Sequence, residues 1–279
     1  MNLKRLLHAP SVLIVLMLLP LITDSCKGNS EVTLATDSVV VEDAFKKSNG
    51  ELCKIKTSVV ITYPVEYKDS EKTLQLQTLY CSALLNATNG MGDVKAALND
   101  YAKSIIAINQ PLTMSQDSVY NSDDFEDIDV DNFEIVVKIT DVYNKNGFLS
   151  FCCENTVRKN NNETSISHSY VNLDLMLMKK LSHSDLFLSQ SESEITQMLK
   201  SKLLETNKVR SEDELYNSCG FFNLQNLSVT DNFFFSDDGI TWCYEPGVIA
   251  VQTVGETSLQ LPFEELMRFK CEDSPLNRL

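Results

Sequence analysis

The stretch NFEIVVKITDVYNKNGFLSFCCENTVR, residues 132–158, decides how the fold is read. In its first half apolar side chains alternate with polar ones, which is the pattern of a strand with one buried face. The alternating apolar residues are Phe133, Ile135, Val137 and Ile139. NKNG, residues 144–147, predicts a turn, because Asn-Gly is a preferred centre of tight hairpins. A second strand, 148–157, completes a predicted antiparallel hairpin.

The residues before this hairpin predict one strand and two helices. KIKTSVVITYPVEY, residues 54–67, is rich in the β-branched and aromatic side chains that favour strands. Residues 71–88 and 94–109 each repeat apolar side chains at the spacing of a helix with one buried face. Asp93 directly precedes the second of these stretches, where an N-cap residue belongs.

The residues after the hairpin continue the mixture of strands and helices. Residues 165–187 predict an alternating strand followed by a turn at Met178–Leu181. Residues 189–205 predict a helix, and Ser191 with Glu194 has the spacing of a capping box at its start.

The last part of the chain predicts a second hairpin and a closing helix. The hairpin lies within residues 222–247, and its turn is SDDG, where we expect Gly239 to take a positive φ angle. Residues 257–261 predict a last strand, and residues 263–269 predict a short helix.

These elements predict an α+β fold in which antiparallel β-sheets pack against helices. We expect two units, an N-terminal one at about 51–158 and a C-terminal one at about 165–270. We expect the two units to share a core or to touch extensively.

Three runs in the last third of the chain resemble a known domain. They are VNLDLMLMKKLSHSDLF (171–187), NFFFSDDGITWCYEP (232–246) and GETSLQLPFEELM (255–267). Their order and spacing resemble the C-terminal domain shared by the anti-sigma factor RsiV and the peptidoglycan deacetylase PdaC, a domain of unknown function. Residues 51–157 have the strand–helix–helix–hairpin plan that commonly precedes it. The tract 246–255 is more apolar than the tyrosine-centred version typical of that family.

The resemblance implies a binding role and supplies no catalytic residue. The anti-sigma relative binds lysozyme through its extracellular region, and the deacetylase carries a separate catalytic domain. Our candidate ligand contacts are Trp242 and Tyr244, since an aromatic ring on a strand can stack on a sugar. The alternative for Trp242 is a place in the core.

The beginning of the chain predicts export. Residues 1–25 combine Lys4 and Arg5 with an apolar run that is too short to cross a bilayer comfortably, as in a signal peptide. Cys26 follows directly, and the segment resembles a bacterial lipoprotein signal in which this cysteine is lipidated. An ordinary secretory signal is the alternative. Residues 26–50 are mostly polar and predict a tether, so we expect a lipid-anchored protein of the cell envelope that faces the periplasm or the exterior.

The net charge of the chain limits the classes of molecule that it is expected to bind. The formal net charge is −15, and it becomes −16 when residues 1–25 remove two basic side chains and one acidic one. Nucleic-acid binding depends on Lys and Arg that neutralise phosphates, so no nucleic-acid partner is expected. A basic protein is a possible partner, because opposite charges steer association. Solubility alone is the other explanation of the acidic composition.

Seven cysteines follow Cys26, and they are Cys53, Cys81, Cys152, Cys153, Cys219, Cys243 and Cys271. An oxidising compartment favours disulfides between some of them, although an odd number leaves at least one thiol. The spacing gives no pairing. No CxxC motif is present, so the sequence predicts neither a zinc site nor a thioredoxin-type site.

The sequence contains no motif for catalysis, a metal or a cofactor. His168 and His183 are the two histidines after the signal, and His183 with Asp185 is a candidate acid–base pair, although such pairs are also common on surfaces. The acidic stretch 115–132 includes Asp127, Asp129 and Asp131. It departs from a calcium loop because Lys138 stands at the position of the bidentate Glu, so we expect a solvated loop.

The sequence therefore predicts a non-catalytic envelope lipoprotein whose domain binds a lysozyme-like basic protein or a cell-wall glycan such as peptidoglycan. The alternatives are a hydrolase or deacetylase accessory enzyme that acts on the cell wall, and a purely structural envelope protein. The enzyme alternative predicts a cleft with a histidine or convergent carboxylates.

Overall fold

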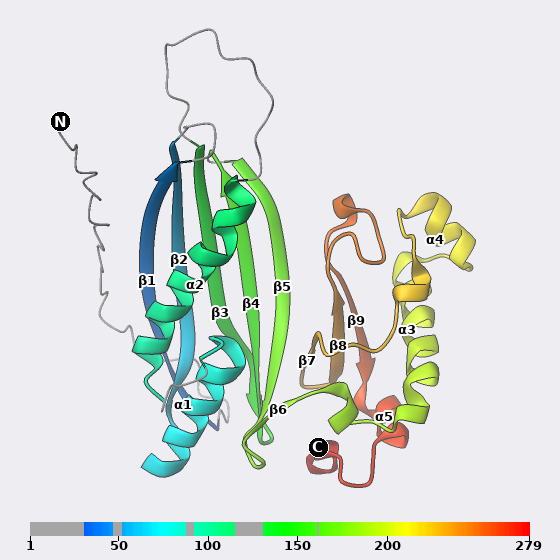
Figure 1. Cartoon of the computed structure of the whole chain (residues 1–279). Helices are drawn as coiled ribbons and strands as arrows, with labels where there is room; N and C mark the ends of the chain where they lie inside the picture. The colour runs from blue at the N-terminus through cyan, green and yellow to red at the C-terminus, as the bar shows by residue number, and fades with distance from the viewer. Residues whose placement is uncertain (1–30, 47–51, 88–91, 115–130, 161) are drawn as a thin grey trace, which may run out of the picture.

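The structure is a computed structural model that describes residues 31–46, 52–87, 92–114, 131–160 and 162–279. Within these residues the chain forms a first sheet of six strands and a second sheet of three, each packed against helices (Figure 1). The predicted α+β fold is therefore confirmed. We call the residues up to Leu181 the first unit and residues 182–279 the second unit.

The first unit contains the first sheet and two helices. Its elements are β1 (Thr33–Lys46), β2 (Leu52–Glu66), α1 (Ser70–Leu84), α2 (Val94–Met114), β3 (Asp131–Lys145), β4 (Phe148–Lys159), β5 (Asn162–Asp174) and β6 (Lys179–Leu181). The strands lie in sequence order, and all neighbours are antiparallel except β2 and β3, which are parallel. The parallel pair exists because α1 and α2 carry the chain back to the end of the sheet where β2 began.

The second unit contains the second sheet and three helices. Its elements are α3 (Glu192–Asn207), α4 (Glu212–Ser218), β7 (Phe233–Phe235), β8 (Gly239–Tyr244), β9 (Thr257–Pro262) and α5 (Phe263–Leu266). Short 3-10 turns lie at His183–Asp185, Ser189–Ser191, Leu224–Asn226, Gln252–Val254, Met267–Phe269 and Pro275–Arg278. The strand order is β7-β8-β9, antiparallel throughout. The predicted hairpin at SDDG is β7–β8.

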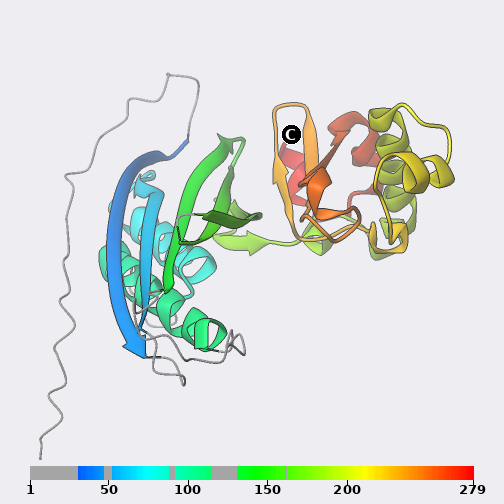
Figure 2. The same ribbon diagram turned by 90° about the horizontal axis from the view of Figure 1, so that it is seen from above.

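The first core lies between the first sheet and its helices. The sheet curves around α1 and α2 (Figure 2). Every second residue of β2 is buried, as the alternation in its sequence requires. Ile135, Val137 and Ile139 of β3 point to the same core, so their predicted inward direction is confirmed. The ring of Tyr80 from α1 meets Phe151 of β4 edge to face, at 5.1 Å between centroids.

The face of the first sheet that turns away from the helices carries paired charges. Glu134 of β3 lies 3.6 Å from Lys56 and 3.1 Å from Arg158, between its neighbours on β2 and β4. Lys138 of β3 lies 3.0 Å from Glu154 on β4. Cross-strand pairs of opposite charge stabilise a solvated sheet face modestly.

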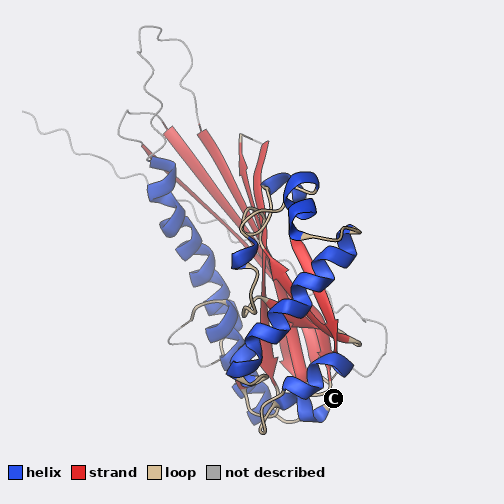
Figure 3. Ribbon diagram, turned by 90° about the vertical axis from the view of Figure 1, so that its right-hand side faces the viewer, coloured by secondary structure: helices blue, strands red, loops and turns tan. Residues whose placement is uncertain are grey.

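The second core lies between the second sheet and α3. The second sheet lies between β5 on one side and α3 on the other (Figures 1 and 3). Phe233, Phe235 and Trp242 are completely buried in it. Tyr143 and Phe148, at the β3–β4 turn, belong to this core although they come from the first unit. The expectation that the two units share a core or touch extensively therefore agrees with the packing.

The tether expected at residues 26–50 is wrong for residues 33–46. Residues 33–46 form β1, which pairs with the whole length of β2. The reason is that Ala35, Val39 and Val41 point to the same side of β1 and are buried against the first core. The expected start of the C-terminal unit, at about residue 165, is also wrong. Residues 165–174 belong to β5, which pairs with β4 in the first sheet.

Two local expectations, a turn and a helix cap, also differ from the structure. The turn expected at Met178–Leu181 lies three residues earlier, at 175–178, because the Asp174 carboxylate accepts the N–H groups of Met176 and Leu177 at 2.8 and 2.9 Å. Residues 179–181 form β6 instead. Ser191 makes no capping hydrogen bond, because its backbone is already helical at the end of a 3-10 turn.

Gly239 is needed in the β7–β8 turn for a reason other than the expected positive φ. Its φ is not positive, whereas a Cβ at this position would come within 2.2 Å of the Leu261 carbonyl oxygen. The glycine therefore permits close approach of β8 and β9. In the β3–β4 turn, by contrast, Asn146 and Gly147 both have positive φ angles, 56° and 76°, as the predicted Asn-Gly hairpin requires.

Candidate functional site

The residues that carry the resemblance build the junction between the two units. Asn172 of β5 accepts a hydrogen bond from the Ser150 hydroxyl at 2.6 Å and donates one to the Phe233 carbonyl oxygen of β7 at 2.7 Å. Lys179 lies 2.6 Å from Asp185, which also accepts the backbone N–H of Ser182 at 2.8 Å. These contacts fix the path of the chain as it leaves the first sheet.

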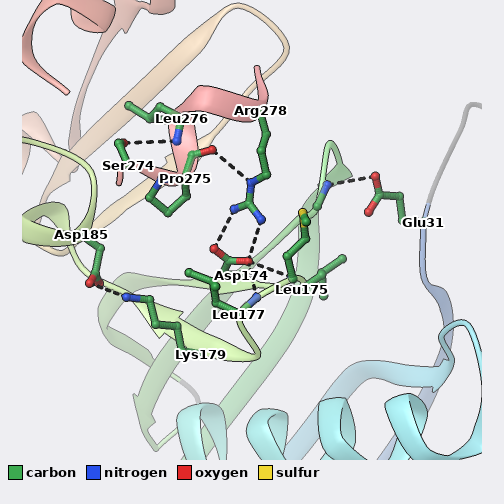
Figure 4. Close-up of polar contacts among 12 residues, drawn as sticks. Glu31, Asp174, Leu175, Leu177, Lys179, Asp185, Ser274, Pro275, Leu276 and Arg278 are labelled. Carbon is green, nitrogen blue, oxygen red and sulfur yellow. Dashed lines mark hydrogen bonds and ion pairs between the residues drawn. The ribbon is translucent and has the colours of Figure 1, made fainter. Parts of the chain in front are cut away.

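Asp174 holds the C-terminal segment against the same junction (Figure 4). Its side chain is 0% exposed and receives two hydrogen bonds from the Arg278 guanidinium, at 2.9 and 2.7 Å. The guanidinium also lies over the Phe148 ring, 4.6 Å from its centroid. A paired arrangement of this kind is what a buried carboxylate requires.

A cleft of about 560 Å³ opens above this junction, with one wall from each unit. The wall of the first unit consists of the C-terminal end of α1, three consecutive residues of β5, and single residues of α2, β4 and β6. Its side chains include Leu84, Asn86, Tyr101, Cys153, Ser169 and Lys180. The wall of the second unit consists of the segments before β7 and after β8. Its side chains include Asp231, Asn232, Cys243, Tyr244, Glu245 and Val248.

Asn232 joins the two walls. Its side-chain oxygen accepts the backbone N–H of Tyr170 on β5 at 2.8 Å. Its amide nitrogen donates to the Cys243 carbonyl oxygen of β8 at 3.0 Å. The Tyr170 ring stacks on Phe234 of β7 with 4.7 Å between centroids. The cleft is therefore positioned by specific contacts between the sheets.

Of the three tyrosines that line the cleft, Tyr101 and Tyr170 are half-buried, whereas Tyr244 is only 3% exposed. Burial raises the pKa of Tyr101, of Tyr170 and of Tyr244 above the ordinary phenol value. The Tyr244 hydroxyl donates to the Ser228 carbonyl oxygen at 2.9 Å, which fixes its ring in the wall. Neutral phenol rings of this kind offer apolar faces and hydroxyl groups to a ligand.

The thiols of the cleft are protonated at neutral pH. Burial raises the pKa of Cys153 to about 12, and burial likewise raises the pKa of Cys243 to about 12. A thiol is a good nucleophile only as the thiolate, so neither group is activated for covalent chemistry.

Three charged side chains line the cleft, and they differ in their partners. Asp231 lies 2.8 Å from Nδ1 of His183 and also accepts the backbone N–H of His183 at 2.8 Å. Lys180 and Glu245 make no ion pair within the residues that the structure describes. Adjacent Lys179 is paired with Asp185, because neighbouring residues of a strand point to opposite sides.

Trp242 does not reach the cleft. Its side chain is 0% exposed in the second core, and its indole N–H has no hydrogen-bond partner among the described residues. The expectation that Trp242 contacts a ligand is therefore wrong, because its side chain belongs to the second core. Tyr244, the other candidate, does line the cleft, so its contact with a ligand stays a prediction.

The two histidines lie outside the lining of the cleft. His168 lies 3.1 Å from Glu256 and 3.7 Å from Glu154. His183 contacts Asp231 and Glu192 rather than Asp185, so the expected acid–base pair with Asp185 is not formed. Asp185 is occupied by Lys179 instead. The His183–Asp231 pair borders the cleft through its carboxylate.

Several residues named in the sequence analysis lie outside the part of the chain that the structure describes. Cys26, Asp127 and Asp129 lie outside them, and Asp131 begins β3. Within the described ranges no group of acidic, His or Cys side chains could hold a metal ion. Free thiols are present at Cys81, Cys152, Cys153, Cys219, Cys243 and Cys271. Among the helices that the structure describes, none has the length and apolarity needed to span a membrane.

Sequence reasoning missed most of the cleft. Tyr101, Tyr170, Lys180, Asn232 and Glu245 are separated by long stretches of chain and share no motif spacing. Asn232 and Glu245 do stand at the two ends of the quoted run NFFFSDDGITWCYEP. Their position at the ends of a hairpin was the available signal, because strand ends are where side chains converge on a cleft.

The comparisons with known proteins agree with this architecture. Residues 184–264 match the model of a family described as DUF3298, a protein of unknown function. The crystal structure of a DUF3298 family member from Bacteroides fragilis has a TM-score of 0.64 at 16% sequence identity, covering 90% of this chain and 98% of that one. A DUF3298 family protein from Pseudomonas aeruginosa has a TM-score of 0.53 at 14% identity, covering 87% and 97%.

No curated protein is similar enough to match. Identities this low show a shared fold and carry no activity with them. The second unit thus holds a match to the DUF3298 domain, and the whole described chain has a fold found in two proteins of that family.

Proposed function

We propose that this protein is a lipid-anchored component of the cell envelope that binds a ligand without catalysis in the cleft between its two units. The observation that carries the proposal is the cleft itself, which joins three tyrosines, two asparagines and three charged side chains from both units. Concave sites with aromatic walls and a few convergent polar groups are typical of ligand-binding sites.

The anchor is supported by the sequence around Cys26. A lipid on this cysteine would place the folded body close to the membrane, because β1 begins at Thr33. The seven Cα–Cα steps from Cys26 to Thr33 span at most about 25 Å when fully extended. Intact-mass spectrometry of the mature protein tests the anchor. We expect acyl chains on Cys26, whereas a mature protein with an unmodified N-terminus elsewhere would contradict it.

A cell-wall glycan is the ligand that the cleft supports best. Sugar rings present apolar faces that stack on aromatic side chains, and their hydroxyl and acetamido groups bond to amides. Tyr101 and Tyr170 provide partly exposed rings, and Asn86 provides an exposed amide. The resemblance to the peptidoglycan deacetylase PdaC points to the same class of ligand.

A matched pair of tyrosine variants tests glycan binding. Tyr101→Ala removes a ring from the cleft wall, whereas Tyr216→Ala removes a ring that is 67% exposed on α4 and does not line the cleft. We expect Tyr101→Ala to weaken binding of a tetramer of N-acetylglucosamine about tenfold or more, since one stacked ring contributes about 1–2 kcal/mol. Equal affinities of both variants and the parent, by calorimetry, would place the ligand elsewhere.

A basic protein is a second candidate ligand, and the charge of the second unit favours it. Residues 182–279 contain 16 acidic and seven basic side chains. Such a surface attracts cations at a rate that falls with ionic strength. Lysozyme, the ligand of the anti-sigma relative, is the probe. Retention of lysozyme on the immobilised protein in dilute buffer, and its loss at 0.5 M salt, would support this candidate. At that salt concentration the Debye length is only about 4 Å, so exposed charges attract each other weakly. No retention at low salt would eliminate it.

The enzyme alternative makes a different prediction, and the His183–Asp231 pair gives it a test. A hydrolase or deacetylase would release reducing ends or acetate from peptidoglycan, and His183→Ala would abolish the release. We expect no release by the parent protein. Product formation that disappears in His183→Ala would overturn the non-catalytic proposal.

A further inference from the structure

We propose that the cleft selects a zwitterionic ligand, a short peptide or peptide substituent with one free ammonium group and one free carboxylate. This inference rests on the proposed function, because it names the ligand chemistry of the same cleft. A cell-wall glycan that carries such a peptide would satisfy both.

Lys180 supplies the carboxylate-binding group. It lies on β6 in the wall of the first unit, and no Asp or Glu of the described residues lies within ion-pair distance. Its side chain is exposed and lines the cleft together with Cys153 of β4. The contrast with Lys179, bound to Asp185 at 2.6 Å, marks Lys180 as the cation that the fold leaves available.

Glu245 supplies the ammonium-binding group on the other wall. It directly follows β8, is exposed, and has no basic side chain of the described residues within ion-pair distance. Asp231, the second carboxylate of this wall, is held by the ring and the backbone N–H of His183. Glu245 and Lys180 therefore face one cleft from opposite walls as unneutralised charges of opposite sign.

The charge of the whole protein argues for a ligand without net charge. An anionic ligand would be attracted by Lys180 but repelled by the acidic second unit. A simple cation would be attracted by the second unit but would meet Lys180 inside the cleft. A zwitterion pairs with both groups, and because its net charge is zero the acidic second unit does not repel it at long range.

The size and neutral lining of the cleft fit a short peptide. Its volume of about 560 Å³ lies within the range of sites for small ligands. Asn86, Ser169 and Thr230 also line the cleft and can bond to peptide N–H and C=O groups. The apolar stretch Leu84, Val171 and Val248 provides contacts for small side chains.

Three versions of one peptide test the inference in the whole mature protein. The probes are trialanine, its N-acetylated form and its C-terminal amide, and binding is followed by calorimetry and by NMR shifts. We expect trialanine to bind at least about tenfold more tightly than either blocked form, since each block removes one charge-assisted contact. Lys180→Gln should remove the preference for the free carboxylate, and Glu245→Gln should remove the preference for the free amine.

Two matched variants control for changes of net charge. Lys54→Gln removes an exposed cation of β2, and Glu272→Gln removes an exposed carboxylate of the C-terminal segment, and neither lines the cleft. Both should bind trialanine as the parent does. Circular dichroism confirms that all four variants are folded, as expected for exposed side chains.

The outcomes separate this inference from the proposed function. If the glycan tetramer binds and trialanine does not, or if blocked and free peptides bind equally, the zwitterion inference is overturned and the glycan site stands. If trialanine binds but neither cleft variant alters its selectivity, the peptide site lies elsewhere and the inference again fails. If neither glycan nor peptide binds, both proposals fail.

Discussion

The two units solve the problem of burying a sheet in different ways. The first core is built mainly from aliphatic side chains on long alternating strands, which leave a charged face in solvent. The second core is built around aromatic rings, and all six residues of β8 are buried. Strands as short as β7, with three residues, cannot bury enough surface alone.

The difference shows that the second unit depends on the first. Phe148 at the β3–β4 turn stacks on Phe235 with 4.5 Å between ring centroids, and Tyr143 lies 6.1 Å from the same ring. The first core receives no comparable residue from the second unit. We therefore expect changes at the shared residues to act mainly on the second unit.

The largest effect is expected for Phe148→Ala. Removing a fully buried ring that joins two units should lower the free energy of unfolding by about 3–5 kcal/mol. Trp242, the one tryptophan of the sequence, reports the second core by fluorescence, and circular dichroism reports both units. In urea we expect the Trp242 transition to precede the circular dichroism transition.

Phe151→Ala is the matched control, because Phe151 is equally buried but belongs to the first core alone. It should destabilise by a similar amount while both signals change together, since loss of the first core removes the support of the second. If Phe148→Ala also gave coincident transitions, the proposed one-way dependence would be refuted.

The next largest effect is expected for Arg278→Ala. It leaves the completely buried Asp174 carboxylate without its guanidinium, and breaking such a pair costs about 3 kcal/mol or more. Arg278→Lys keeps a positive charge but loses the two-pronged contact, so its loss should be smaller. Chemical denaturation of the three proteins measures both.

Lys145→Ala serves as the comparison for Arg278→Ala. Lys145 lies 2.7 Å from Asp237 and also joins the two units, but this pair is exposed to solvent. Its removal should change stability little, because water and salt screen exposed pairs. A Lys145 variant as unstable as the Arg278 variant would show that burial does not separate the two contacts.

An intermediate effect is expected for Asn232→Ala. The substitution removes the acceptor of the Tyr170 N–H and the donor to the Cys243 carbonyl oxygen, and the loss is about 1–2 kcal/mol. Amide hydrogen exchange at Tyr170 should accelerate, whereas exchange at Ile139, inside the first sheet, should stay slow. Unchanged exchange at Tyr170 would mean that another group satisfies this N–H.

The smallest effect is expected for Glu154→Gln on the solvated face of the first sheet. The Lys138 ammonium lowers the pKa of Glu154 from its ordinary value of 4.5. The stabilisation is therefore present above pH 4.5 and is lost as the pH falls through the lower folded-state pKa. At pH 7 the variant should lose less than about 1 kcal/mol, and at pH 3 parent and variant should unfold at closer denaturant concentrations. A difference that grows on acidification would contradict the ion pair.

The elements that sequence predicted well are those with a local period. The β3–β4 hairpin follows from alternation and Asn-Gly, and α1, α2 and α3 follow from apolar spacing. β1 was missed because the residues around its three valines are mostly polar. The preference of these valines for a strand depends on pairing with β2, which local sequence does not reveal. The parallel pairing of β2 with β3 was missed because it depends on how two helices return the chain.

The cleft was beyond sequence reasoning for a related reason. Its walls come from residues such as Tyr101 and Glu245, which only the packing of two units brings together. The motif residues Asn172, Asp174 and Lys179 were recognisable in sequence, yet they specify the junction. The residues that sequence motifs identify hold the two units together, whereas the cleft is lined mostly by residues outside recognisable motifs.

The pairing of Asp174 with Arg278 has a consequence for how the protein is made. The two residues are 104 positions apart in the chain, so a ribosome completes every strand of the first sheet well before the guanidinium is synthesised. Until then the carboxylate must stay hydrated, and the surface that Phe148 shares with the second unit stays open. We expect a nascent chain stalled before Arg278 to be more sensitive to protease at the β5–β6 turn than the released protein.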